Sequence, residues 1–456
     1  MKKLLAIALA GVLFPSMLSA QTTDAALRRV TSADQGSRDS SGNLETLSAS
    51  EHLARAETYS ANRLFPQARA HWQKFLENYP SDPGVAKALF GTARSYMWER
   101  KYDKAVDWFD RLTRDYINTK DGREGLAFKG ASLVRLGRNL EAAKVYEQYV
   151  SMFPQGERAE SAYLNIIDAY REGGKYDEAN RWVDKTTAQY SGKPAEISAL
   201  HARLRMDIYR ESWPEAIRTA DALLGRGRFA GSMTGTDEVK YLRAFALERA
   251  GRRAEALAAY SSIPRNLNSY YSGLASEKAA GGPVKLISSV TPRFYSDYPV
   301  MYRAELLQAA RSRKVDPRFV LAIMKQESSF RSSAKSPAGA RGLLQLVYDT
   351  ALKYKNAAGY PNLQPDHLYT PAVNIAVGSA YIADLKDEFG GLYEAIAASY
   401  NGGEDNVARW INRSKPKEAG IFTSEVGFAE SKAYVFKVMN NYRIYRELYT
   451  EDLQRR

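Results

Sequence analysis

Small and aromatic residues recur along the first half of the chain with a period of 37 residues. Alanines mark the period, and aromatic side chains flank them, most often three residues before and four or eleven residues after. The alanines are Ala68, Ala105, Ala142, Ala179, Ala216 and, after 40 residues, Ala256, and the flanking aromatic residues include Phe65, Tyr102, Tyr176, Trp213, Trp72, Phe109, Tyr146, Tyr79, Tyr116, Phe153 and Tyr190. This pattern is typical of helical hairpins, because a small residue lets two helices approach closely while aromatic rings fill the gap to the next hairpin. We therefore predict a solenoid of stacked helical hairpins over residues 51–280, with these aromatic side chains in its core.

The period disappears after a segment that is rich in helix breakers. Residues 281–299 contain Gly-Gly-Pro and Thr-Pro steps and predict a linker. From residue 300 to 456 the helical pattern continues, but Gly-containing loops separate shorter helices, which indicates a second, compact α-rich domain. Residues 21–50 are polar and rich in Ser, Thr and Asp, and they predict a flexible lead-in. The fold class expected from these patterns is all-α.

The first 20 residues have the order of a cleavable secretory signal peptide. Two lysines are followed by an apolar run of eleven residues and then by a small-residue stretch that ends at Ala20, after which we predict cleavage. Eleven apolar residues are too few to span a bilayer, and no later segment reaches the length of about 18 that a spanning helix needs. The sequence therefore predicts export to the periplasm and no integral membrane span in the mature chain.

The composition excludes several kinds of site. The chain has no cysteine, which excludes disulfides, thiol catalysis and cysteine-ligated zinc. The four histidines are scattered and form no HExxH-type motif, and no phosphate-binding loop is present, so we expect neither a metal nor a cofactor. The formal net charge of +13 favours an anionic partner. Nucleic acid is a remote choice of partner, because the chain is expected to be exported.

Glu327 is an acidic residue on the apolar side of a predicted helix. Asp316-Pro317 is a good helix start, since an acidic cap precedes proline at the first helical position. Val320, Ile323 and Met324 precede Glu327 by seven, four and three residues, which places all four on one helix face. Poor solvation and the helix C-terminus both raise the pKa of a carboxyl, as a general acid requires. A solvated helix end, or an ion pair with Lys325 or Arg331, is the structural alternative.

Three further stretches of the second domain supply polar residues beside glycines. Ser336 and Gln345 lie in a loop rich in small residues, where glycine allows a polar ligand to approach the backbone. A short helix delivers Tyr400 and Asn401 immediately before Gly402-Gly403, although an Asn-Gly pair is also an ordinary helix end. A third stretch contains Glu425, Glu430 and Tyr434. Each stretch alone is unremarkable in composition, and their order and combination carry the functional signal.

The second domain resembles the lysozyme-like catalytic domain of the Slt-type lytic transglycosylases, which cleave bacterial peptidoglycan. The upstream hairpins resemble slightly lengthened tetratricopeptide repeats, and the whole layout is similar to the soluble members of that family. The resemblance implies a TPR-like α-superhelical solenoid followed by a lysozyme-like catalytic domain. It rests on five blocks in the family's order: QESSF at Glu327, KSPAGARGLLQL through Gln345, NIAVGSAYIADL from Asn374, ASYNGG at Tyr400 and FTSEVGFAESKAYVFKV through Glu425 and Tyr434.

The resemblance implies cleavage between N-acetylmuramic acid and N-acetylglucosamine. Glu327 matches the family's essential acid, which protonates the glycosidic oxygen and then acts as base toward the muramoyl C6 hydroxyl, so that a 1,6-anhydro ring closes without water. The substrate's own N-acetyl group would stabilise the charge at C1, so no nucleophilic carboxylate is needed. By the same matching, Tyr400 and Asn401 should hold the acid and the acetamido group. Ser336 and Gln345 should line the sugar sites, and Glu425 should assist from the far wall.

Two positions depart from the family pattern. Val347-Tyr348 stand where Met-Pro is common, which changes one wall of the expected sugar groove. The block commonly read Ala-Tyr-Asn-Ala-Gly is here Ser399-Tyr400-Asn401-Gly402-Gly403, with the tyrosine and asparagine retained. Neither change removes the acid.

Two other functions stay open at this point. A hydrolytic muramidase or chitinase would use the same acid with water as the acceptor, and Glu425 could orient that water. A non-catalytic scaffold would bind peptidoglycan through the groove and recruit partners through the solenoid. The joint presence of Glu327, Tyr400 and Asn401 favours the enzyme. For the solenoid itself we expect either that it shapes the approach of the glycan strand or that it binds a cell-wall protein.

Overall fold

The computed structural model describes residues 17–227, 229–287 and 289–456. Within these ranges the regular secondary structure is helical, and β pairing is limited to isolated bridges. The all-α prediction is therefore confirmed. The signal-peptide prediction concerns residues 1–20, of which residues 1–16 lie outside the described part of the chain. The described residues form two compact units, residues 17–186 with the turn Ser336–Gly339, and Thr187–Lys335 with Ala340–Arg456.

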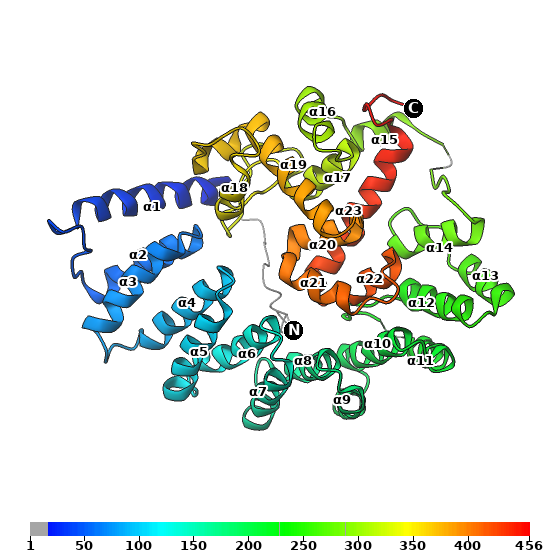
Figure 1. The fold of residues 1–456 in the computed structure, drawn as a ribbon, viewed down its shortest axis with the longest axis horizontal. Helices are drawn as coiled ribbons and strands as arrows, with labels where there is room; N and C mark the ends of the chain where they lie inside the picture. The colour runs from blue at the N-terminus through cyan, green and yellow to red at the C-terminus, as the bar shows by residue number, and fades with distance from the viewer. Residues whose placement is uncertain (1–16, 228, 288) are drawn as a thin grey trace. The chain divides into compact units, whose positions relative to one another are not determined.

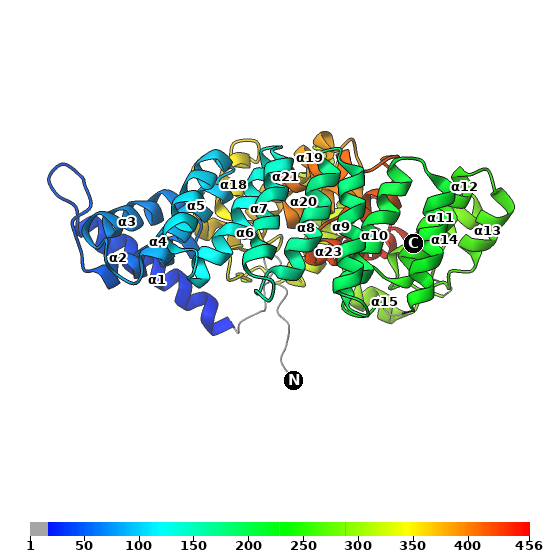
Figure 2. The ribbon, with the colours of Figure 1, turned by 90° about the horizontal axis from the view of Figure 1, so that it is seen from below.

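The first unit is an array of helices that pack on their neighbours along the chain (Figures 1 and 2). The repeat alanines Ala68, Ala105, Ala142 and Ala179 have no exposed surface, as close approach of paired helices requires. The TPR-like packing predicted from the 37-residue period is thus confirmed here. The helices are α1 (Met17–Gly36), α2 (Ala49–Ala61), α3 (Phe65–Asn78), α4 (Val85–Trp98), α5 (Tyr102–Tyr116), α6 (Lys120–Arg135), α7 (Asn139–Met152), α8 (Ala159–Glu172) and α9 (Tyr176–Gln189), whose end passes residue 186.

The segment predicted to be a flexible lead-in is instead partly helical and held by side chains of the first hairpin. Asp34 of α1 is buried and accepts hydrogen bonds from Tyr59 (2.6 Å) and His71 (2.9 Å), and it pairs with Arg55. Polar composition suggested disorder, because it does not reveal that a carboxylate will find three partners in the adjoining helices.

Two buried histidines form a chain of hydrogen bonds that requires both rings to be neutral. The backbone N–H of Leu47 donates to Nε2 of His52 (3.0 Å), which assigns the ring proton of His52 to Nδ1. That Nδ1 faces Nδ1 of His71 at 3.0 Å, and Nε2 of His71 donates to Asp34. Protonation of His52 would remove the acceptor of the Leu47 amide.

Acid is therefore expected to destabilise this unit. Burial lowers the pKa of His52 from 6.5 to about 4, so the unfolded chain binds more protons in this window and stability falls as pH decreases through it. The expected loss is about 2 kcal/mol at pH 5. The substitution His52→Gln keeps an acceptor for Leu47 without a titrating ring, and it should flatten the dependence of Tm on pH between about 6.5 and 4.5. An unchanged slope in thermal unfolding would contradict the assignment.

The second unit joins the last repeat helices to the C-terminal domain. Its repeat part, here called the C-terminal repeat helices, has its own apolar core around Leu204, Leu242 and Phe245. Gly281 takes φ 70° directly after the last of these helices and so ends it in the left-handed region. These helices are α10 (Pro194–Tyr209), α11 (Trp213–Arg226), α12 (Thr236–Arg249), α13 (Arg253–Ser261) and α14 (Tyr270–Ala280).

The C-terminal domain packs short helices around a second apolar core. The long helix α23 lies against α17 and α20 in this core (Figure 1). The short helix α15 lies within the segment predicted as a linker. The helices are α15 (Pro292–Asp297), α16 (Arg303–Arg311), α17 (Pro317–Ser328), α18 (Tyr348–Tyr354), the 3-10 turn η1 (Pro365–Tyr369), α19 (Pro371–Glu388), α20 (Tyr393–Gly402), α21 (Glu404–Asn412), α22 (Ala419–Glu425) and α23 (Ala429–Leu448).

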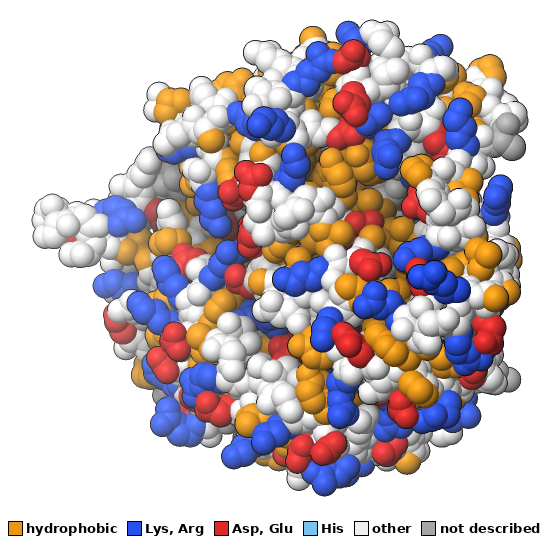
Figure 3. All heavy atoms as spheres, turned by 45° about the vertical axis from the view of Figure 1, so that its right-hand side comes forward, with side chains coloured by type: hydrophobic (Ala, Val, Ile, Leu, Met, Phe, Trp, Pro, Cys, Tyr) orange, Lys and Arg blue, Asp and Glu red, His pale blue; other side chains and the backbone are white. Residues whose placement is uncertain are grey.

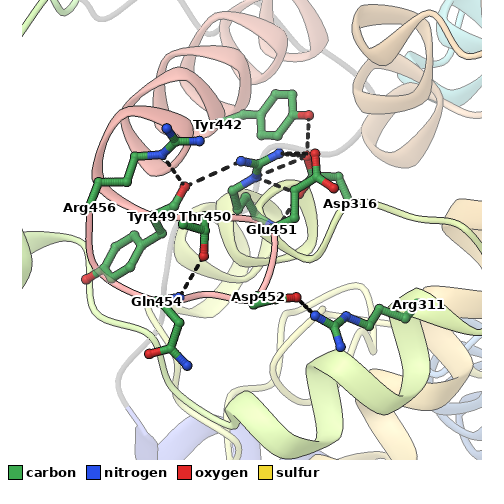
Figure 4. A network of polar contacts seen from close by, with 10 residues as sticks. Arg311, Asp316, Tyr442, Tyr449, Thr450, Glu451, Asp452, Gln454 and Arg456 are labelled. Atoms are coloured by element: carbon green, nitrogen blue, oxygen red, sulfur yellow. Dashed lines mark hydrogen bonds and ion pairs between the residues drawn. The ribbon is translucent and has the colours of Figure 1, made fainter.

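A polar network fixes the start of α17 against the end of the chain (Figure 4). Asp316 caps α17 by accepting from the Arg318 amide (2.9 Å), and it also accepts from the Tyr442 hydroxyl of α23 (2.8 Å). The guanidinium of Arg318 bonds Asp316 and reaches Glu451 at 3.2 Å. These contacts tie α17 to α23 at the end of α17 that is distant from Glu327.

Candidate active site

Glu327 is the next-to-last residue of α17, as the hydrophobic pattern predicts. The preceding turns of this helix, from Phe319 to Met324, have no exposed surface, and Ser329 ends the helix with φ 49°. Glu327 itself keeps part of its surface accessible, although protein atoms surround its carboxyl closely. A ligand can therefore reach a carboxyl group that water solvates poorly.

The surroundings of Glu327 favour its protonated form near neutral pH. Burial is the largest influence and raises the pKa of Glu327 from 4.5 to about 7, with a smaller contribution of the same sign from Glu430. The hydroxyl of Tyr434 donates to Oε1 of Glu327 (2.7 Å) and acts in the opposite direction. The two nearby cations have backbone partners: Lys325 donates to the carbonyl of Asp297, and Arg331 to that of Ser328. A carboxyl with this pKa can give and take a proton at neutral pH.

Tyr434 is a site residue that the sequence analysis named in the third polar stretch without assigning it a role. It comes from the second turn of α23, and its hydroxyl is the hydrogen-bond partner of Glu327. Glu430 precedes it by one helical turn on the same helix. The i, i+4 spacing of Glu430 and Tyr434 was the available signal, because it places both on one face.

The structure places Tyr400 and Asn401 at the end of α20, but it corrects the expected partner of Tyr400. The Tyr400 hydroxyl donates to the carbonyl of Leu344 (2.7 Å), so the acid is held by Tyr434 and not by Tyr400. Burial raises the pKa of Tyr400, and the nearby Glu327 adds to this rise. Tyr400 thus stays a neutral hydroxyl beside the acid.

Asn401 is oriented by the first turn of α23. Its Oδ1 accepts from the Ser431 hydroxyl (2.6 Å), and it hydrogen-bonds the carboxyl of Glu430. Burial raises the pKa of Glu430, and the bond with Asn401 opposes that rise. A second carboxyl, that of Glu430 on α23, therefore faces the site beside the side-chain amide of Asn401 on α20.

The loop after α17 is closed by its own polar groups. Gln345 has φ 45°, and its side-chain amide donates to the carbonyls of Ala334 (3.0 Å) and Gly342 (2.8 Å). Gln345 is half-buried, and its side-chain NH₂ group fixes the conformation of the loop. Because both N–H groups are used in this way, Oε1 is the side-chain atom that remains for a sugar contact. Ser336 begins the turn Ser336–Gly339, and its carbonyl accepts from Gly339 (3.0 Å). A sugar-binding role for Ser336 and Gln345 stays a prediction.

Glu425 was expected to assist from the far wall of the sugar site, but the structure encloses its carboxylate in an ion pair. It is the last residue of α22, it is 1% exposed, and its Oε2 pairs with Arg205 of α10 at 3.0 Å. Arg413 lies at 3.5 Å from the same oxygen. A carboxylate enclosed by two guanidinium groups serves packing between the C-terminal domain and α10. Sequence could not reveal this, because Arg205 is 220 residues away.

The described residues contain no group of three or more His, Cys, Asp or Glu side chains arranged to hold a metal ion. Over the same residues, no helix combines the length and the apolar character needed to cross a bilayer. The polar residues gathered at the site are Glu327, Tyr434, Tyr400, Asn401 and Glu430.

Comparison with known proteins agrees with the geometry. Residues 306–422 match the family described as Transglycosylase SLT domain, and residues 53–118 and 129–194 match Tetratricopeptide repeat. The soluble lytic murein transglycosylase of Salmonella typhimurium is 29% identical over 151 residues, which are 33% of this chain and 23% of that protein. The membrane-bound lytic murein transglycosylase C of Salmonella arizonae is 33% identical over 196 residues, covering 37% of this chain and 54% of that protein. The chain thus aligns with about a quarter of the length of the soluble relatives.

A solved structure shows the same fold. The lytic transglycosylase Slt of Pseudomonas aeruginosa, determined as an inactive mutant, matches 93% of this chain and 86% of its own with a TM-score of 0.51 and 18% sequence identity. The matched transglycosylase segment begins in α16, includes Glu327 and Asn401, and ends in α22. The chain therefore carries a transglycosylase SLT domain that follows N-terminal tetratricopeptide repeats.

Proposed function

We propose that this protein is a lytic transglycosylase that cleaves the β-1,4 bond between N-acetylmuramic acid and N-acetylglucosamine in peptidoglycan. The state of Glu327 in the SLT domain carries the proposal. Its carboxyl is partly accessible, its pKa is raised to about 7, and it accepts a hydrogen bond from the Tyr434 hydroxyl. A group that is half protonated near neutral pH can serve as acid in one step and as base in the next.

The proposed reaction uses one carboxyl twice. Protonated Glu327 gives its proton to the glycosidic oxygen as the bond to C1 breaks, and the substrate's acetamido group stabilises the charge at C1. The carboxylate then takes the proton of the muramoyl C6 hydroxyl as O6 bonds C1, which closes the 1,6-anhydro ring and restores the acid. Tyr434 stabilises the carboxylate between these steps, because its hydroxyl donates to the charged form. Asn401, fixed by Ser431, is the candidate to bind the acetamido group.

A hydrolytic reaction is the second candidate, and the contact between Glu430 and Asn401 favours it. Glu430 lies on the site side of α23 with Asn401, so a second carboxyl is available to orient water. Glu425 does not serve this purpose, because it is enclosed by Arg205 and Arg413. The two reactions differ in mass balance, since hydrolysis adds one water to the product.

Analysis of the products distinguishes these candidates. Purified peptidoglycan is digested with the protein, and the muropeptides are identified by mass spectrometry. We expect products about 18 Da lighter than those of a hydrolytic muramidase in a parallel digest, because an intramolecular hydroxyl replaces water. Ordinary reducing ends would contradict the transglycosylase proposal and favour hydrolysis, and glycan binding without cleavage would favour a scaffold.

We further propose that the protein acts in the periplasm, on the basis of its N-terminal pattern, and that the repeats guide the glycan strand or bind a cell-wall protein. Basic and acidic side chains are interspersed over the face shown in Figure 3, so the net charge of +13 is not gathered in one patch there. An excess of dispersed positive charge favours an anionic polymer whose muramic acid and peptide stems carry carboxylates. Full activity on polymeric substrate after deletion of the repeats would contradict the guiding role.

A further inference from the structure

Helix α23 has two faces with different neighbours. Tyr434, Val438 and Tyr442 belong to the core of the C-terminal domain. The opposite stripe of α23, spaced as one helix face, lies against the C-terminal repeat helices. In this stripe Phe436 stacks on Tyr270 of α14 with ring centroids 5.4 Å apart, and the other members are Lys432, Met439 and Arg443. One helix thus contributes to both cores, and its first turns also carry the site residues.

The stripe begins with a buried ion pair. Lys432 is 1% exposed, and its Nζ donates to Oε1 of Glu238 on α12 at 2.6 Å. Nε2 of His201 on α10 lies 3.0 Å from the same oxygen, and Glu238 is also 1% exposed. Burial lowers the pKa of His201 to about 4, so the ring beside Glu238 is neutral at pH 7. This carboxylate therefore lies against helices from distant parts of the chain, and it accepts the hydrogen bond of Lys432.

The same junction contains a second ion pair. Arg205 on α10 pairs with Glu425 on α22 at 3.0 Å, and the charges of both residues act on Lys432. Burial lowers the pKa of Lys432 and Glu238 opposes this, while the pKa of Glu238 itself is held below its usual value by Lys432 and His201 despite its burial. With water excluded, each charge depends on its partner.

Lys432 lies between the residues that contact the site. Ser431 and Glu430, one and two positions before it, contact Asn401, and Tyr434, two positions after it, holds Glu327. A shift of the first turns of α23 by a fraction of an ångström would lengthen these contacts together. A buried ion pair resists such a shift, because sliding would leave two charges unpaired in a poorly solvated interior.

We propose that Glu238 of the repeat region and Lys432 of α23 are positioning residues for the active site, fixing α23 so that Tyr434 contacts Glu327 and the turn before it contacts Asn401. The repeats thereby take part in catalysis through the Glu238–Lys432 ion pair and not only as a guide for substrate. The activity readout rests on the proposed function, whereas the contact itself can be measured without substrate.

The test compares Lys432→Met, which keeps the length of the stem and removes the charge, with the unaltered protein. We expect kcat on peptidoglycan to fall about tenfold with KM changed less than about twofold, because the acid is misplaced while the sugar sites remain. We also expect the titration of Glu327 to move to higher pH, since the Tyr434 bond that stabilises its carboxylate weakens. That titration is followed by NMR of protein labelled with ¹³C at glutamate carboxyls, with the Glu327 signal identified by its loss in Glu327→Gln.

Two controls separate positioning from stability. Arg69→Met removes the partner of Glu99 from an ion pair of 2.9 Å in the first unit, and it should leave the Glu327 titration unchanged. The double variant Glu238→Met/Lys432→Met leaves no unpaired charge, and it should recover Tm while the Glu327 titration stays shifted.

An unshifted titration in Lys432→Met, or a double variant that restores Tm and titration together, would overturn the proposal. If Lys432→Met does not fold, Glu238→Gln, which keeps shape and hydrogen bonding, takes its place with the same criteria. A wild-type protein that leaves peptidoglycan intact would refute the proposed function but not the positioning role, because the NMR readout needs no substrate.

Discussion

Replacement of Glu327 by glutamine is expected to reduce the rate of peptidoglycan digestion by about 10³-fold or more. Glutamine has nearly the same shape and can still accept the Tyr434 hydrogen bond, but it has no proton to give to the glycosidic oxygen and cannot act as base. Loss of a general acid alone costs about 10² to 10⁴ in rate, and this residue would perform two transfers. Initial rates of muropeptide release at pH 6 measure the effect, with Glu305→Gln of α16 as a control outside the site.

The pH dependence of the unaltered protein follows from the same carboxyl. Because the acid must be protonated in free enzyme, kcat/KM should fall with a basic limb near the pKa of Glu327, which burial raises to about 7. Retention of more than about a tenth of the activity in Glu327→Gln would assign the proton transfer to another group, with Glu430 the first to examine.

Replacement of Tyr434 by phenylalanine is expected to lower kcat by about 10- to 100-fold and to move the basic limb upward by about one pH unit or more. The hydroxyl bonds Oε1 of Glu327 at 2.7 Å, and a hydrogen bond to a charged group contributes about 1.5–3 kcal/mol. Without it the carboxylate is less stable, so the pKa of Glu327 rises, the proton is held more firmly and its transfer is slower. The pH profile of kcat/KM and the product yield at pH 6 and 8 provide the measurement.

The matched control for this substitution lies on the same helix. Tyr442, two turns further along α23, donates to Asp316 at 2.8 Å (Figure 4), and Tyr442→Phe removes a hydroxyl of the same kind from a buried contact outside the site. It should lower stability by about 1 kcal/mol and leave the pH profile in place. Equal shifts of the basic limb in both variants would indicate a general loosening of α23 and contradict a direct role for Tyr434.

The partners of two predicted residues illustrate what a sequence pattern cannot supply. Tyr400 was expected to hold the acid, yet its hydroxyl bonds the Leu344 carbonyl, and Tyr434 takes that place. Glu425 was expected near the sugar and instead pairs with Arg205. Which groups these side chains meet depends on how α20, α22 and α23 pack, and no local spacing in the sequence encodes that packing.

The sequence by itself determined the features that depend on local spacing. A 37-residue period specifies stacked hairpins, since each unit can bury its apolar face only against the next. The cap at Asp316-Pro317 and the apolar positions three, four and seven residues before Glu327 place an acid at the end of a buried helix stripe.

The tertiary structure alone decided the long-range contacts. Tyr434 lies 107 residues from Glu327, and Lys432 lies 194 residues from Glu238, so neither pairing leaves a periodic trace in the sequence. The helix at residues 17–36 also had no such trace, since its Asp34 is held by side chains 21 to 37 residues away. The raised pKa of Glu327 also depends on tertiary packing. Burial is its largest cause, and the carboxyl is buried only when the other helices pack around α17.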